Sequence, residues 1–142
     1  MRSRFRSSRR RCLAAGLLLA AGQALGGPAL AGEVIVIANG LPAMSPEEVK
    51  EVFLGEVQFS GSTRLLPVDN ASAQPDFQAR VLKMVATKYT ASWTKKAFRD
   101  GLNAPPVKGS DAEVIGYVKA NPGAIGYVSA PPGAGVQVLG KY

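Results

Sequence analysis

Apolar residues along the chain occur in two patterns, short continuous runs and runs spaced by three or four positions, which predict alternating strands and helices. Residues 33–39 form a β-branched run with no polar alternation, which indicates a strand buried on both faces. Residues 64–69, 124–128 and 135–139 predict three further strands. Pro67 lies inside the first of these three, so we expect a strand end, an edge or a bulge there.

The segment after the first strand carries the signals of a helix start and a helix end. Ser45 and Glu48 have the spacing of a capping box, and Pro46 suits the first helical position. Gly55 suits the position just past the helix end. The buried face of this helix is predicted from apolar residues three and four positions apart, at Val49, Val52 and Phe53.

Three more helices are predicted before the last two strands. They begin near residue 75 or 76, at about residue 89, and at the Ser110 cap. Their expected inward-facing residues are Phe77, Val81, Leu82 and Val85, then Tyr89, Trp93 and Ala97, then Val114, Ile115 and Val118. Residues 101–109 are expected to form a loop. The resulting order of strand, helix, strand, three helices and two strands predicts an α/β domain with one mixed sheet and helices on its faces.

The charge of the chain is concentrated at its N-terminus. The 142 residues include 17 Lys and Arg against 10 Asp and Glu, a net charge of +7, and six of the basic residues precede residue 12. Residues 32–142 therefore carry 11 basic and 10 acidic residues. Such a small excess of basic residues gives little electrostatic attraction to a phosphate backbone, so we expect no nucleic-acid partner. We expect a solvated basic face, or one that meets anionic lipid or an acidic partner, at Lys83, Lys88, Lys95, Lys96 and Arg99.

Residues 1–31 have the features of a secretory signal peptide. An arginine-rich start precedes an apolar run from Leu13 to Leu25, and Ala29 and Ala31 fit the small-residue rule for cleavage after Ala31. The sequence therefore predicts export of residues 32–142 to the periplasm, by the general or the twin-arginine route. The alternative is an uncleaved N-terminal anchor.

The residue inventory excludes several kinds of chemistry. The sequence contains no His, and its single Cys, Cys12, lies in the predicted leader. A Ser-His-Asp triad, an imidazole zinc site and a thiol nucleophile in the exported part are therefore excluded. We expect no metal, no cofactor and no enzymatic activity.

Four stretches, taken together and in order, point to a known family. They are residues 49–55, residues 65–69, Trp93 with Phe98, and residues 110–114 leading to the Pro-Gly-Ala-Ile-Gly-Tyr-Val run at 122–128. This order resembles the substrate-binding protein of the phosphate ABC transporter and its small one-lobe relatives. The resemblance covers about residues 34–139 and implies a type II periplasmic binding-protein fold, in which two α/β lobes hold a ligand between them. The 111 residues after the leader suffice for a single lobe.

The resemblance also identifies a departure at the expected phosphate site. Members that bind phosphate carry an Arg after the second strand and then a Ser-Gly-Thr turn. In this chain these positions fall at Asp69 and at residues 73–75, where Pro75 has no amide proton. A carboxylate 4 Å from an anion repels it by about 4 kcal/mol at an effective dielectric constant of 20. We therefore do not expect phosphate to bind by the inherited route.

The polar loop after the second strand is the predicted ligand site, because open α/β sheets bind ligands at the carboxyl ends of their strands. The candidate contacts are Asp69, Asn70, Ser72 and Gln74, with Asn39 after the first strand and Ser45 at a helix start. Helix capping and helix entry are the alternative roles for the same residue types.

Three functional hypotheses follow. The first is an exported, non-enzymatic domain that binds a small anion or polar solute, or a transporter or envelope protein. The second is binding of phosphate or another oxyanion through backbone amides, for an ABC transporter. The third is an enzyme that uses carboxylates or a Ser-Lys pair, although no spacing in the sequence favours one. Because a single lobe leaves a face uncovered, we also expect self-association or a partner.

Overall fold

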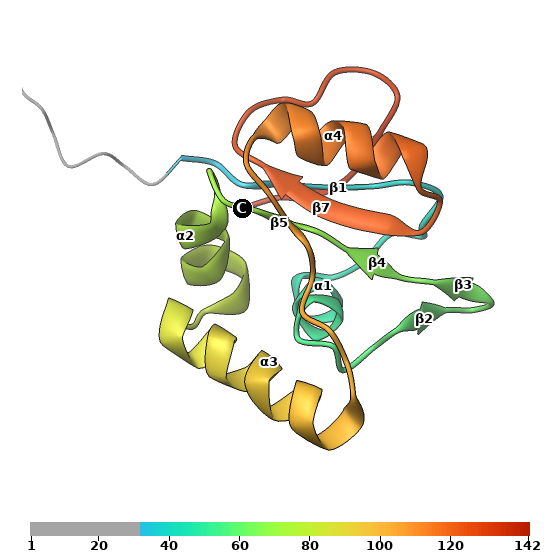
Figure 1. The fold of residues 1–142 in the computed structure, drawn as a ribbon. Helices are drawn as coiled ribbons and strands as arrows, with labels where there is room; N and C mark the ends of the chain where they lie inside the picture. The colour runs from blue at the N-terminus through green and yellow to red at the C-terminus, as the bar shows by residue number, and fades with distance from the viewer. Residues whose placement is uncertain (1–31) are drawn as a thin grey trace, which may run out of the picture.

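A computed structural model describes residues 32–142, and the predicted signal peptide lies outside the described residues. Its main sheet has the strand order β4-β7-β1-β8 (Figure 1). The strands are β1 (Ile35–Ala38), β4 (Leu66–Pro67), β7 (Ala124–Val128) and β8 (Gln137–Lys141). β1 runs antiparallel to both β7 and β8, whereas β4 runs parallel to β7. The prediction of a mixed sheet is confirmed.

The predicted strand at residues 64–69 is divided in the structure. β4 is followed by Val68, whose amide donates to the carbonyl oxygen of Ile125 at 2.9 Å, and then by β5 (Asp69–Asn70). β5 pairs in parallel with β6 (Val107–Lys108) in a separate two-stranded sheet, directly after the edge strand β4. β6 lies in the segment that the sequence predicted to be a loop, and two residues are too few to carry a strand pattern.

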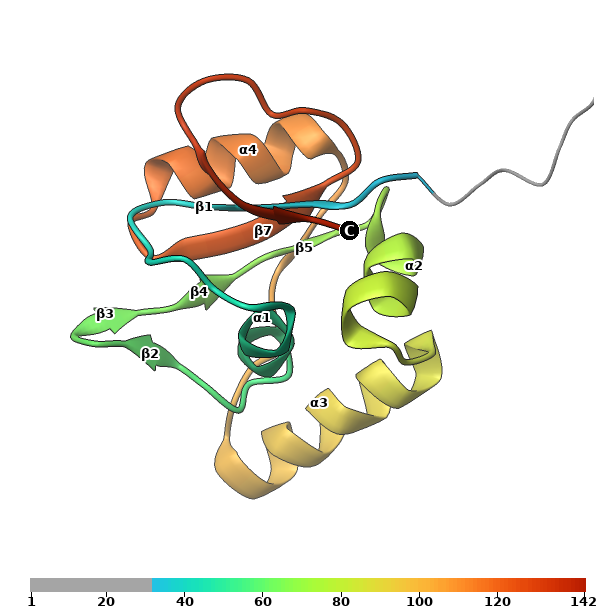
Figure 2. The ribbon, with the colours of Figure 1, turned by 180° about the vertical axis from the view of Figure 1, so that it is seen from behind.

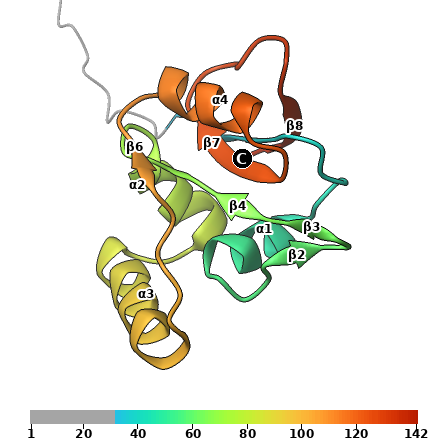
Figure 3. The same ribbon diagram turned by 45° about the vertical axis from the view of Figure 1, so that its right-hand side comes forward.

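A short hairpin precedes this edge. It consists of β2 (Phe59–Ser60) and β3 (Thr63–Arg64), joined by a turn at residues 61–62. Figure 3 shows the hairpin extending from the body of the domain beside β4. Of these four strand residues, the sequence analysis placed only Arg64 in a strand.

The first and last helices begin as predicted. In α1 (Pro46–Phe53), Ser45 Oγ accepts from the Glu48 amide at 3.2 Å and Glu48 Oε2 accepts from the Ser45 amide at 2.7 Å, so the capping box is confirmed. In α4 (Asp111–Ala120), Ser110 caps the Glu113 amide, but Glu113 accepts from the amide of Gly109. The predicted Ser110 cap is therefore confirmed, and Glu113 caps the residue before it.

The middle helices differ from their predicted register. α2 (Gln74–Phe77) continues into a π-helical turn, η1 (Gln78–Leu82), and α3 spans Ala86–Asp100. Val85 was expected to face inward, but it is 61% exposed at the N-cap of α3, because the wider π turn ends the buried face at Leu82. Ala97 was also expected inward and is exposed, because the buried positions of α3 end at Lys96.

Helices cover both faces of the sheet, as Figures 1 and 2 show. α4 packs on one face, and α1, α2, η1 and α3 lie on the other. The residues of β1 alternate between these two cores, with Ile35 and Ile37 on the α4 side and Val36 and Ala38 on the other. This double coverage explains why the first strand has no polar positions.

The last strand begins two residues later than predicted. Gly135 has a φ of +97°, a backbone conformation that a strand residue does not adopt, so the preceding loop extends to Val136. Among residues 32–142, no helix combines the length and the apolar character needed to cross a membrane.

Candidate functional site

A buried carboxylate lies at the first residue of β5. Asp69 is 2% exposed, and its two oxygens accept hydrogen bonds from Tyr89 Oη at 2.7 Å and Tyr127 Oη at 2.9 Å. Burial raises the pKa of the Asp69 carboxyl above its ordinary value, and the two hydroxyl donors reduce this shift. Burial and the negative charge of Asp69 also raise the pKa of both tyrosines, which therefore remain protonated donors.

An aromatic cluster fixes one of these donors. The ring of Tyr127 stacks on Phe77 with 3.8 Å between centroids and an interplanar angle of 6°. Phe53 meets both rings edge to face, at 4.7 Å from Phe77 and 5.6 Å from Tyr127. The hydroxyl that holds Asp69 is thus positioned by packing within the core.

A cleft opens beside Asp69, between the α2–η1 segment, α3 and the segment before β6. This α3 cleft has a volume of about 490 Å³, within the range of small-molecule sites. Its polar lining includes Asp69, Gln74, Gln78, Thr90 and Asn103. Among the described residues that line it, Asp69 is the only one with a charged side chain. Trp93, the single tryptophan of the sequence, also lines this cleft.

Several polar groups of the α3 cleft have no partner among residues 32–142. The Gln78 residue is only 7% exposed, yet its side-chain amide makes no hydrogen bond to the described residues. Every fully buried side-chain nitrogen or oxygen in that part of the chain does have a partner, so the Gln78 amide must reach solvent at the cleft. The side chains of Gln74 and Asn103 are likewise unpartnered within residues 32–142. Unpaired amides at a concave surface are available to a ligand.

The rest of the predicted loop forms a network around Asp111. Asn70 Nδ2 donates to Asp111 Oδ1 at 2.7 Å, and Ser72 Oγ lies 3.4 Å from the same oxygen. The amide and hydroxyl of Ser129 donate to Asp111 Oδ2 at 3.1 and 2.9 Å. Partial burial raises the pKa of Asp111, but hydrogen bonds from Asn70, Ser129 and Ser72 outweigh it and hold the pKa below the ordinary value. The network joins the loops after β5 and β7 to the start of α4.

A second cleft lies on the other side of residues 101–106. This hairpin cleft, of about 270 Å³, is lined by Gln58, Arg64 and Tyr117. It shares Trp93 and residues 102–105 with the α3 cleft. Arg64 is exposed and supplies the only side-chain positive charge among its described lining residues. The segment between α3 and β6 thus divides two clefts of different charge.

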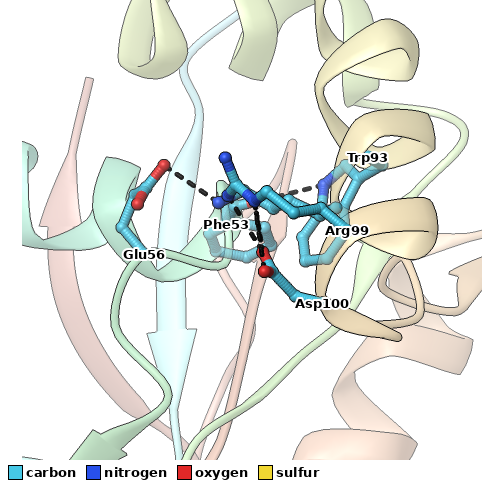
Figure 4. A network of polar contacts seen from close by, with 6 residues as sticks. Phe53, Glu56, Trp93, Arg99 and Asp100 are labelled. Atoms are coloured by element: carbon cyan, nitrogen blue, oxygen red, sulfur yellow. Dashed lines mark hydrogen bonds and ion pairs between the residues drawn. The ribbon is translucent and has the colours of Figure 1, made fainter.

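Contacts near the end of α1 hold α3 in place, as Figure 4 shows. The indole nitrogen of Trp93 donates to the carbonyl oxygen of Phe53 at 3.1 Å. Lys96 is buried and pairs with Glu56 at 3.0 Å, so its predicted place on a solvated face is wrong. The side chain of Lys96 is only 7% exposed, whereas that of Glu56 is 59% exposed, so the pair lies at the edge of the buried core.

Solved structures with a related fold come from phosphate transport. An ABC-type phosphate transport receptor from Vibrio cholerae matches with a TM-score of 0.50 at 11% identity, over 77% of this chain and 46% of the receptor. The fold is that of one receptor lobe. A phosphate ABC transporter substrate-binding protein from Clostridium perfringens, solved with bound phosphate, matches with a TM-score of 0.55 at 12% identity, over 77% of this chain and 45% of that protein.

The chain spans about half the length of the proteins that it matches. The predicted fold class is confirmed: the domain has the fold of a single lobe of a type II periplasmic binding protein, with a mixed sheet flanked by helices. No protein-family model matches the sequence, and a search of curated proteins gives no match.

The structure places the six predicted contact residues in different surroundings. Asp69 and Gln74 line the α3 cleft. Asn70 and Ser72 belong to the Asp111 network. Asn39 Nδ2 donates to the carbonyl oxygens of Val118 and Lys119, at the end of α4, and Ser45 caps α1.

Sequence reasoning did not select Gln78, Thr90 or Asn103. Gln78 carried a usable signal, since it follows Gln74 by four positions and a helical segment places such a pair on one face. Thr90 and Asn103 come together with them only through the path of α3 and the loop that follows it.

Proposed function

We propose that the chain is an exported, non-enzymatic binding domain. In this proposal residues 1–31 are a signal peptide cleaved after Ala31, and residues 32–142 act in the periplasm. The lobe fold supports a binding role, because one protein with a related fold is named a phosphate transport receptor and another a phosphate ABC transporter substrate-binding protein. Detection of Gly32 as the N-terminal residue of protein recovered from the periplasmic fraction tests export, and intact Met1 in the cytoplasmic fraction contradicts it.

The α3 cleft is the proposed binding site for a small solute. The observation that supports this best is the pairing of a buried carboxylate, Asp69, with the unpartnered amides of Gln74 and Gln78 at one concave surface. Groups of this kind fix the orientation of a ligand in an otherwise apolar pocket. A transporter or envelope protein that takes up the solute is the proposed partner.

Trp93 provides the experiment that tests solute binding. Since the sequence contains no other tryptophan and Trp93 lines both clefts, its fluorescence reports on ligands in either one. The processed protein is titrated with sugars, amino acids, diamines, phosphate and sulfate, while its melting temperature is followed in parallel. We expect a saturable change with at least one class. No change with any class contradicts the proposed function.

Binding of phosphate or another oxyanion is the second candidate. Two observations favour it, the named phosphate receptors among the related structures and the exposed Arg64 in the hairpin cleft. Calorimetry with phosphate, sulfate and chloride tests it, with Arg64→Gln expected to remove the heat of binding. If phosphate binds equally well to Arg64→Gln, the hairpin cleft is not the oxyanion site.

A further inference from the structure

We propose that the α3 cleft binds an uncharged, polyhydroxylated solute about the size of a monosaccharide. This inference rests on the proposed function and specifies its ligand. It follows from the charge of the cleft, the state of its carboxylate and the kind of groups left without partners.

The charge of the lining disfavours anions. The described residues around the α3 cleft include no Lys or Arg, and Asp69 contributes a negative charge. An anion in this cleft meets repulsion without a compensating cation, and burial of the carboxylate strengthens that repulsion. Phosphate therefore does not suit this cleft, unlike the hairpin cleft with its Arg64.

The hydrogen bonds of Asp69 also disfavour direct pairing with a cationic ligand. Its carboxylate is 2% exposed, and each oxygen already accepts a hydrogen bond from a tyrosine hydroxyl. A ligand ammonium group would have to displace Tyr89 or Tyr127 to form a direct pair. The carboxylate instead fixes the Tyr89 hydroxyl at the wall of the cleft.

The available groups are neutral and offer both donors and acceptors. Gln74, Gln78 and Asn103 each have an amide NH₂ and a carbonyl oxygen, and none of the three side chains has a partner within residues 32–142. A hydroxyl group also donates and accepts, so several hydroxyls on one small molecule match several amides. The walls between them are apolar, at Trp93, Leu102, Pro105 and Val107. Such walls suit the C–H faces of a sugar ring.

The test compares ligand classes and two matched variants. Trp93 fluorescence and calorimetry are recorded for the processed protein with glucose, galactose, mannose and myo-inositol, each to millimolar concentration, and in parallel with putrescine and sodium phosphate. We expect saturable binding of at least one of the four uncharged compounds. Gln78→Leu removes an amide of the α3 cleft and should weaken that binding by roughly tenfold or more. Gln58→Leu makes the same change in the hairpin cleft and should leave binding unchanged.

The outcomes separate the inference from the proposed function. If only putrescine or phosphate binds, the inferred ligand class is wrong while solute binding stands. If a sugar binds Gln78→Leu as tightly as the unchanged protein, or is lost with Gln58→Leu, the α3 cleft is not its site. If none of the compounds in the wider panel binds, the proposed function itself fails. A melting curve for each variant verifies that it is folded before its binding is compared.

Discussion

Single residues in this domain show where side chains serve the fold and where they do not. Tyr89 and Tyr127 donate to Asp69, and Asn39 and Ser45 cap helix ends, so the polar side chains of these residues have partners within the fold. Gln78 differs from them because its side-chain amide makes no hydrogen bond to the part of the chain that the structure describes and instead reaches solvent at the α3 cleft. A residue that the fold does not need is a stronger candidate for binding than one that the fold uses.

Replacement of Gln78 by leucine should therefore leave the protein folded and about equally stable. The substitution breaks no hydrogen bond to the described residues and keeps a similar volume, and the amide that it removes reaches solvent at the α3 cleft. We expect the free energy of unfolding to change by no more than about 0.5 kcal/mol. Urea denaturation followed by Trp93 fluorescence measures it. Gln58→Leu, at an exposed position, is the control and should change stability little. A loss of stability in Gln78→Leu would mean that the amide has a structural role.

The pH dependence of stability should depend on Asp69. Because its pKa is raised in the folded protein above 3.8, the folded state holds this proton more tightly than the unfolded state. The stabilisation that protonated Asp69 gives to the folded state is fully present at low pH. It is lost as the pH rises from 3.8 through the folded-state pKa. Asp69→Asn lacks this titration, so its stability relative to the unchanged protein should increase over that interval. Urea denaturation at a series of pH values measures the difference, and parallel pH profiles would contradict the prediction.

At the scale of elements, the junction between α1 and α3 depends on Gly55. Gly55 has a φ of +71°, and a Cβ atom there would lie 2.7 Å from Cη2 of Trp93. The residue thus supplies a left-handed helix end and also allows the Trp93 ring to approach. The same junction holds the buried Lys96 against Glu56.

Gly55→Ala should therefore destabilise the domain by about 2 kcal/mol or more, since both the backbone and the indole ring must shift. The matched control is Gly116→Ala, because Gly116 lies within α4 and a Cβ atom there meets nothing within 4 Å. We expect the control to gain about 0.5–1 kcal/mol from helix propensity. Thermal and urea denaturation measure both changes. Equal effects of the two substitutions would show that the Trp93 contact does not matter.

The elements that the sequence predicted best are those whose signals are local. The capping residues Ser45 and Ser110 and the apolar runs of β1 and β7 define their own positions. The strands β2, β3, β5 and β6 have two residues each and exist through pairing with partners that the sequence does not indicate. The α3 cleft was only partly predictable for the same reason, since Asp69 and Gln74 follow a strand whereas Asn103 reaches them through tertiary structure.

The whole molecule has about half the length of the receptors whose fold it shares, and it exposes large apolar side chains. Phe98 is 90% exposed on α3, and Phe59 is 56% exposed on the hairpin. Exposed apolar side chains of this size are available for contact with a second surface. This supports the expectation of self-association or of a protein partner.

Phe98→Ser tests that expectation. If copies of the chain associate through α3, light scattering during size-exclusion chromatography should show a mass above that of the monomer, and the substitution should lower it. Stability should change by no more than about 0.5 kcal/mol, because the ring contributes little to the core. A monodisperse monomer at high concentration would contradict self-association and leave a different protein as the partner.

The Asp111 network has a consequence for any free oxyanion. A carboxylate is itself an oxyanion, and Asp111 already occupies the donors of Asn70 and Ser129 from within the same polypeptide. Because Asp111 belongs to the same chain as these donors, its effective concentration is in the millimolar range or above. A dissolved anion must be more concentrated or bind more tightly to displace it. Asp111→Ala would leave those donors at the start of α4 without their carboxylate. The domain would then gain an anion site that Asp111 now occupies.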